Sequence, residues 1–459
     1  MTPIAIAPDS TVENLLSTLP DVTGGPAWAA TLRAAASRHF AEAGLPTTSD
    51  EEWRLTNIGP ITQQAYRAAA APQGFPRSRI AQFLPDIPLA AQLVFINGHF
   101  NAELSARAAP GDVRVSALGK AIADDEAVVR DYLGQIAPLQ DDPFGALNSA
   151  ALSDGVLVHV AAGVEASLPI HALFITDPGE HPVITFPRVL VVAEANARVT
   201  VIETHAGFPG GVYFSNAVTE VHAGPGARVE HVQLQRESLG DFHMGLLSAR
   251  LAAGATLSTH VLHFGGALVR NNVNVLLNGD GAEATLNGLT ITSGRQLIDN
   301  RTILDHAQPH CPSHELYKAV MDGRSKGIFR GRILVRPGAQ KTDSKQNSKT
   351  LLLSDDAVMD SQPQLEIYAD DVKCTHGSTT GPLDDEQIFY LRARGVELPF
   401  ARDMLTYAFA TDVVNRIGNE PLRDYAEKLV RGILRYHSSG GGVSEEFSGV
   451  SNNGNGVPT

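Results

Sequence analysis

The sequence predicts a mainly β protein whose central part is a solenoid of stacked strands, with helical domains on both sides. Three observations predict it. Short alternating segments begin at about residue 155, a weak repeat of 27 to 30 residues runs through them, and helical periodicity occupies both flanks. The composition agrees, because 42 Gly and 27 Pro with only 6% aromatic residues suit many short strands and turns.

Residues 1–152 are predicted to form a mostly helical domain. Capping-box sequences at Ser10 to Glu13 and at Ser49 to Glu52 each mark the start of a helix. A strand-like piece, LVFINGHF (93–100), interrupts the helical pattern, which resumes at about residue 117. The N-terminal domain is therefore expected to end just before the first repeat.

Residues 153–384 are predicted to form the solenoid. Strand-like runs are each opened by a Gly-Ala or Asn-Ala pair, and successive pairs lie 27 to 30 residues apart. A regular spacing of this size indicates stacked units, each of which forms one coil of a β-helix. A β-sandwich with evenly spaced hairpins fits the same pattern. The pairs are Asn196-Ala197, Gly226-Ala227, Gly254-Ala255 and Gly281-Ala282, with Gly338-Ala339 about two periods further on.

Residues 385–437 are predicted to form a C-terminal helical domain. Apolar residues recur at helical spacing from Leu422 to Leu434, after a pair of helices expected at about 385–394 and 400–416. The tail, 438–459, has almost no large apolar side chains and is predicted to be disordered.

Bulk properties exclude several classes of protein. No apolar run reaches the roughly 18–20 residues that span a bilayer, and the N-terminus lacks the features of a signal peptide. We therefore expect a cytoplasmic protein without a membrane partner. Two cysteines exclude a disulfide framework, and a net charge of −14 argues against nucleic acid as a partner. The chain lacks a phosphate-binding loop, so we expect no ATP hydrolysis.

Imidazoles and a thiol gather in one short segment, formed by His306, His310, Cys311 and His314. Such groups can bind Zn²⁺ or Fe²⁺, which makes a metal-dependent enzyme the alternative function. The spacing matches no standard zinc finger, and nearby prolines break any helix that would align the groups. Histidines that only form hydrogen bonds are the other interpretation.

A second thiol–imidazole pair is Cys374-Thr375-His376. Residues i and i+2 of a strand face the same way, so both side chains could meet one ligand. Cys374 could equally fill core, and His376 could form hydrogen bonds within the solenoid.

The segment 318–349 holds nine Lys/Arg against two Asp, including Lys341, Lys345 and Lys349. A nucleic-acid-binding solenoid would normally add interleaved aromatic residues. A solvated face, or a docking face for an acidic partner, is the interpretation we prefer.

Long stretches of the chain resemble the SufB/SufD family of iron–sulfur cluster assembly proteins. The resemblance covers nearly all of the chain before the tail. Weaker similarity occurs in GLPTTSDEEWRLT (44–56), VFINGHF (94–100) and FGALNSAALSDG (144–155). The stretches that carry it are FGGALVRNNVNV (264–275), IDNRTILDHAQPHCPSHELYKAV (298–320), GIFRGRILVRPGAQKTDSKQNSKTLLLS (327–354) and PQLEIYADDVKCTHGSTTGPLDDEQIFYLRARGV (363–396).

Within the family, IYADDVKCTHGSTTG takes the form of the SufD member. The SufB member has a glutamate directly after the histidine and a cysteine 19 positions before it, where this chain has Gly377 and Ala357. The resemblance implies a right-handed parallel β-helix between helical domains. It also implies a scaffold subunit without ATPase activity that pairs with SufB and docks the ATPase SufC.

The resemblance also implies site residues. His376 matches the family histidine at the SufB interface, where it would hold a transient iron or iron–sulfur cluster with Cys374 in a secondary role. No tightly bound cofactor is expected. The C-terminal helices match the region that docks SufC, with Phe389, Leu405 and Phe409 as candidate contacts. The sequence leaves open whether the isolated chain forms a homodimer.

Overall fold

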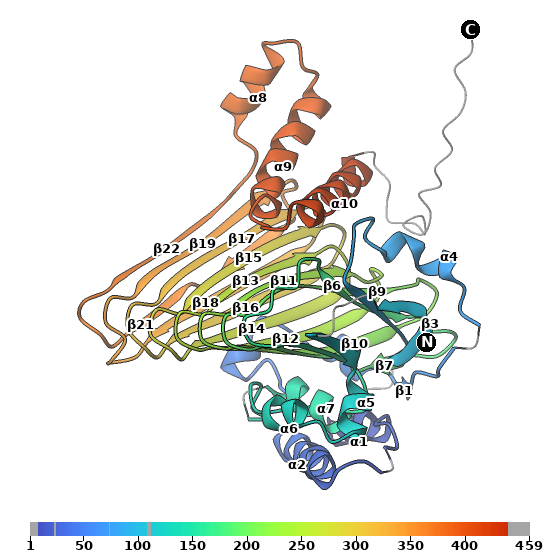
Figure 1. Cartoon of the computed structure of the whole chain (residues 1–459). Coiled ribbons are helices and arrows are strands. Elements are labelled where there is room, and N and C mark those ends of the chain that lie inside the picture. Colours follow the sequence, from blue (N-terminus) through green and yellow to red (C-terminus); the bar gives the residue numbers. More distant parts are fainter. Residues whose placement is uncertain (1–7, 23, 73, 108–111, 141, 439–459) are drawn as a thin grey trace.

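The structure, a computed structural model, describes residues 8–22, 24–72, 74–107, 112–140 and 142–438. Its centre is a β-solenoid of about eight coils, in which two parallel sheets face each other (Figure 1). The predicted parallel β-helix is confirmed, and the sandwich alternative is wrong because consecutive strands of each sheet pair in parallel. The predicted disordered tail lies outside the described residues, apart from Ser438.

Each coil gives one strand to each sheet. Sheet A contains β5 (Val156–Val160), β8 (Arg188–Ala193), β10 (Tyr213–Ala223), β12 (Phe242–Leu251), β14 (Leu268–Leu277), β16 (Leu297–His306), β18 (Lys326–Val335), β20 (Val358–Ser361) and β21 (Gln364–Ile367), and β7 (Val183–Thr185) links it to β1 (Arg67–Ala68). Sheet B contains β6 (Ile170–Thr176), β9 (Arg198–Gly207), β11 (Arg228–Arg236), β13 (Thr256–His263), β15 (Glu283–Thr292), β17 (Pro312–Met321), β19 (Asp343–Leu352) and β22 (Lys373–Gly381).

The Gly-Ala repeat marks the corner where each coil passes from sheet A to sheet B. Asn196, Gly226, Gly254 and Gly281 adopt positive φ angles, and the alanine after each is fully buried. The next coil uses His310-Cys311 at this corner, with His310 at φ 57° and Cys311 fully buried. The repeat therefore arises because each corner needs one tight turn followed by one small side chain that points inward.

Strands that the sequence analysis did not fully predict close the N-terminal end of the solenoid. The strand-like piece forms a hairpin of β2 (Ala91–Ile96) and β3 (His99–Arg107) through Asn97-Gly98, both at positive φ. β2 extends sheet B beside β6, and β4 (Val113–Ala117) extends sheet A antiparallel to β5.

Most of the N-terminal helices pack on the outer side of sheet A, whereas α4 (Arg77–Ile80) and η2 (Ala81–Phe83) pack against sheet B (Figure 1). Helix α1 begins at Pro8 rather than Ser10, and the second capping box leads into the single turn η1. These elements are α1 (Pro8–Ser17), α2 (Ala27–Ala43), η1 (Glu51–Trp53), α3 (Gly59–Thr62), α4 (Arg77–Ile80), η2 (Ala81–Phe83), α5 (Leu118–Ala123), α6 (Ala127–Tyr132) and α7 (Pro143–Ala150).

The C-terminal helices are α8 (Asp385–Arg392), α9 (Leu398–Val414) and α10 (Glu420–Ser438). α9 and α10 bury an apolar face on the outer side of sheet B, whereas α8 projects away from the sheets (Figure 1). None of the helices in the described ranges is long and apolar enough to cross a membrane.

The interior is packed so closely that certain coils require glycine. A β-carbon at Gly288 would lie 2.2 Å from the Tyr317 ring, which is itself buried against Phe329. We expect Gly288→Ala to lower the free energy of unfolding by about 1–3 kcal/mol, because the ring must move. Urea denaturation measures this change. Gly240→Ala is the control, since its β-carbon would meet nothing within 4 Å. Equal stability of the two variants would contradict the packing argument.

Candidate functional site

The last coil of the solenoid is the least covered part of the β structure. β22 pairs only with β19, and β20 and β21 pair only with β18. Within the described chain, no strand covers their other edges, so backbone N–H and C=O groups there are free to bind a partner. This surface is hereafter called the open end.

Cys374 and His376 both lie on β22, at the open end. Cys374 is in register with Ser344 and His376 with Gln346, and both of these β19 residues are buried inside the solenoid. Since residues in register share a face, Cys374 and His376 lie on the same inward side. His376 is nevertheless exposed because no further coil covers it, whereas Cys374 packs half-buried against the core.

The surroundings of Cys374 favour the thiol over the thiolate in the free chain. Burial raises the pKa of Cys374, an effect that the backbone N–H of Ser344 opposes and the charge of Asp343 reinforces. A bound cation would reverse this preference, since metal binding stabilises thiolate.

Exposed apolar side chains lie on or next to β20 and β21, the sheet A strands of the last coil. Tyr368 is 61% exposed and Val358 is 50% exposed, and Ile367 is exposed as well. Inside the solenoid such residues would lie under the next coil. An exposed apolar patch beside an unpaired strand edge is typical of a protein–protein contact.

The histidine-rich segment does not gather into one site. His306 is buried and shares a hydrogen bond with Ser313, whereas His310 is exposed and contacts Asp280. The Cys311 thiol donates to backbone carbonyl groups at the coil corner, and burial raises its pKa. His314 lies on β17 between two inward-facing residues and so faces outward.

The basic segment is largely neutralised by acidic residues of nearby strands, loops and helices. Exposed pairs of this kind contribute only about 0–1 kcal/mol each. Several of the acidic partners belong to the last coil, which the pairs therefore hold in place. The pairs are Lys318–Asp412, Arg324–Asp356, Lys326–Asp360, Arg330–Glu51, Arg332–Glu366, Arg336–Asp305, Lys341–Asp371 and Lys345–Asp343.

The C-terminal helices expose a second apolar surface. Phe389 is 73% exposed on α8, as predicted for a docking residue, but Phe409 packs towards sheet B and its ring lies 4.4 Å from the Lys318 ammonium. Leu405 is half-buried. The sequence analysis did not select Tyr390, Leu398, Phe400 and Met404, which are also exposed.

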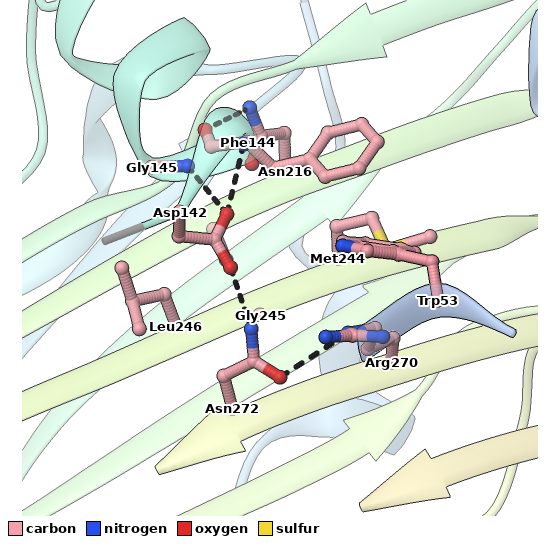
Figure 2. Close-up of a pocket in the computed structure, with 11 residues that line it drawn as sticks. Trp53, Asp142, Phe144, Gly145, Asn216, Met244, Gly245, Leu246, Arg270 and Asn272 are labelled. Atoms are coloured by element: carbon pink, nitrogen blue, oxygen red, sulfur yellow. Dashed lines mark hydrogen bonds between the residues drawn. The ribbon is translucent and has the colours of Figure 1, made fainter. Parts of the chain in front are cut away.

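A small pocket lies between the N-terminal region and sheet A, and most of its polar side chains are paired with one another (Figure 2). Asp142 caps α7 and accepts a hydrogen bond from Asn272, and Asn272 in turn accepts one from Arg270. The Arg270 guanidinium lies 3.6 Å from the centre of the Trp53 ring. The pocket is therefore part of the interface between the N-terminal region and sheet A.

Ionisable side chains also line the solenoid interior. Burial alone would raise the pKa of Glu203, but His205 at 2.7 Å and His231 at 3.1 Å hold it well below its ordinary value. Among the described residues, no group of three or more His, Cys, Asp or Glu side chains could hold a metal ion. The fold thus defines a parallel β-solenoid protein whose reactive groups at its open end lie on a surface.

Comparison with known proteins identifies the family. A family model described as SUF system FeS cluster assembly, SufBD core domain, matches residues 174–409, and one for the SufBD protein N-terminal region matches residues 26–172. The chain belongs to the SufBD family of iron–sulfur cluster assembly proteins, and the predicted resemblance is confirmed.

Two relatives support the assignment over most of their length. An iron–sulfur cluster assembly SufBD family protein of Synechocystis is 32% identical over 389 residues, covering 81% of this chain and 84% of its own. The iron–sulfur cluster assembly protein SufD of Escherichia coli is 31% identical over 383 residues, covering 83% of this chain and 87% of its own. This chain is thus a homologue of SufD.

We expect the protein to lose stability in mild acid. Burial lowers the pKa of His171 and His263 to about 3 and of His260 and His306 to about 4. The unfolded chain binds these protons near pH 6.5, so the stabilisation is complete above about pH 6.5 and falls towards pH 4. Burial raises the pKa of Glu315 and Asp241 to about 7. These two carboxyl groups favour the folded state in acid and so oppose the effect of the histidines, but there are four histidines.

Urea denaturation at about pH 7 and about pH 5 measures the balance. The urea midpoint should be lower at the acidic pH. A midpoint that stays constant or rises would show that the buried histidines do not outweigh the two carboxyl groups.

Proposed function

We propose that this chain is the SufD-like scaffold subunit of an iron–sulfur cluster assembly complex. It would pair with a SufB-like subunit through the open end and dock a SufC-like ATPase through the C-terminal helices. The observation that carries the proposal is the open end itself, where a chain of this family presents Cys374 and His376 beside an unpaired strand edge.

The open end suits iron or an iron–sulfur cluster that is bound only transiently. Thiolate and imidazole are suitable ligands for the iron of a cluster. This chain would supply only these two ligands, so the remainder must come from the partner. Because His376 is exposed on one side, partner association could complete the ligand set and its dissociation could release the cluster.

The exposed surface of α8 and α9 suits a separate partner. Its aromatic side chains resemble the anchors of protein interfaces, and they project from the solenoid on helices rather than at the open end. The chain has no phosphate-binding loop, so motion driven by ATP would have to reach it through such a contact.

The two competing functions have less support. A metal-dependent enzyme would need His306, His310, Cys311 and His314 to converge, and they point to different sides of the coil. A nucleic-acid-binding surface would need free cations, and most of the basic segment is paired with carboxylates. The cytoplasmic location stays a prediction.

His376→Ala should reduce cluster formation by the assembled complex by about tenfold or more, since one ligand is lost. Partner association should be unchanged, because the strand edge and the apolar patch remain. The measurement is the rate of cluster formation followed by visible absorption, with co-purification of the SufB-like subunit as the test of assembly.

Thr380→Ala is the matched control for this variant. Thr380 lies on the same strand and the same side, four residues further on, and it is also exposed. Full cluster formation by His376→Ala would remove the imidazole from the site. Misfolding of that variant alone would instead make His376 a structural residue.

A double variant, Phe389→Ser with Phe400→Ser, should abolish co-purification of the SufC-like ATPase. Both rings are more than half exposed, so the change removes anchors without opening the core. The urea midpoint should stay unchanged. Leu168→Ser, an exposed apolar change on the solenoid, is the control. Retention of the ATPase by the double variant would place its docking surface elsewhere.

A further inference from the structure

Buried polar atoms without a hydrogen-bond partner run through the interior of the solenoid from β12 to β19. Each of four consecutive coils contributes at least one, and every side chain involved is more than nine-tenths buried. Such atoms are rare because burying an unpaired polar group is costly. They belong to His243, whose Nδ1 pairs with Glu237 at 2.9 Å but whose Nε2 has no partner, and to His263, Asn271, Asn300, Thr302, Glu315, Tyr317, Gln346 and Thr350.

The register of the strands aligns the later members of this row with the open end. Asn271 lies beside Asn300, and Glu315 lies beside Gln346. Gln346 in turn lies beside His376 in the last coil. Two strand spacings separate Glu315 from His376, a distance of about 10 Å along the solenoid.

Glu315 is the acidic member of the row. Its Oε2 accepts a hydrogen bond of 2.7 Å from the Gln346 side chain, whereas its Oε1 has no partner. Burial raises the pKa of Glu315 to about 7, although the nearby Thr302 hydroxyl and then the Gln346 amide favour the charged form.

Tyr317 is the neighbouring titratable group on the same strand. Its pKa is raised well above 10, first by burial and then by the charge of Glu315, so it keeps its proton. Glu315 is therefore the group near the open end that can gain or lose a proton at neutral pH while remaining inside the solenoid.

We propose that ordered water fills this row and connects the Glu315 carboxyl to the open end, making Glu315 an internal proton store for the site at Cys374 and His376. That Glu315 serves the site at Cys374 and His376 rests on the proposed function. The water path between Glu315 and the open end does not depend on that function. Buried waters typically form about three hydrogen bonds, and the unpaired oxygen atoms of Glu315 and Gln346 supply two adjacent partners.

The transfer needs no other reactant. When Cys374 binds a metal, its thiol proton moves along the water row to the Glu315 carboxylate, which becomes a neutral carboxyl group and returns the proton by the same route when the metal leaves. Metal ligands release protons when they bind a metal, and a covered interface has little bulk water to receive them. Glu315 would be a positioning residue, because it does not touch the cluster.

Infrared spectroscopy of the isolated, full chain tests the path without iron or a partner. Glu315→Gln should remove one carboxylic acid band, which assigns that band. After transfer to D₂O near pH 6, the band of the unmodified protein should shift at once. In Gln346→Leu the shift should be slowed by about tenfold or more, because exchange then depends on rare local opening.

Ser348→Ala is the matched control, since Ser348 is buried on the same face of β19 two residues away. It should exchange like the unmodified protein. If Gln346→Leu does not fold, Thr302→Val gives the same test from β16. The path is overturned if the unmodified protein exchanges as slowly as Gln346→Leu, or if Glu315→Gln removes no band.

The assembled complex tests the use of the path. Glu315→Gln should flatten the pH dependence of cluster formation between about pH 6 and pH 8, where Glu315 titrates. An unchanged pH profile would overturn the role of Glu315 at the site. If His376→Ala also left cluster formation unchanged, the proposed site would be wrong, while the exchange results on the isolated chain would still stand or fall separately.

Discussion

Each coil of a parallel solenoid depends on the coil before it and the coil after it for its backbone hydrogen bonds. This requirement fixes the in-register stacking of β5 to β22, and it leaves the last coil paired on only one side. The candidate site follows from the same fact. Cys374 and His376 occupy inward positions that would be covered in any earlier coil, and the β structure of the described residues ends at this strand.

The placement of the helices keeps this end free. Most of the N-terminal helices cover the outer side of sheet A, and α9 and α10 cover the outer side of sheet B. Neither group crosses the open end. The fold thereby separates two surfaces, one made of a strand edge with a thiol and an imidazole and one made of exposed aromatic residues on α8 and α9.

The repeat made the solenoid predictable because a tight corner needs a positive φ angle followed by a small buried side chain. The same rule explains why His310 and Cys311 resembled a metal motif. They occupy the corner at the expected spacing, with histidine at the left-handed position and the thiol in the core. Spacing alone could not show this, since the sequence does not state which residues face inward.

Other features depended on contacts between distant residues. The exposure of Phe400 and Met404 and the burial of Phe409 follow from how α9 lies on sheet B, which helical periodicity does not fix. The row of unpaired polar atoms inside the solenoid could not be predicted from the sequence either. Glu315 and Gln346 are 31 positions apart and come together only through strand register. The exposure of His376 required knowing that, up to residue 438, no later strand covers β22.

The two ends of the solenoid differ in a way that limits the size of any assembly. At the N-terminal end, β2 and β3 form an antiparallel hairpin and β4 runs antiparallel to β5, so this end does not match the open end. Head-to-tail addition of one solenoid to the next therefore has no repeating contact. Association through two open ends closes after a single pair, which protects a protein with an unpaired strand edge from growing into a fibre.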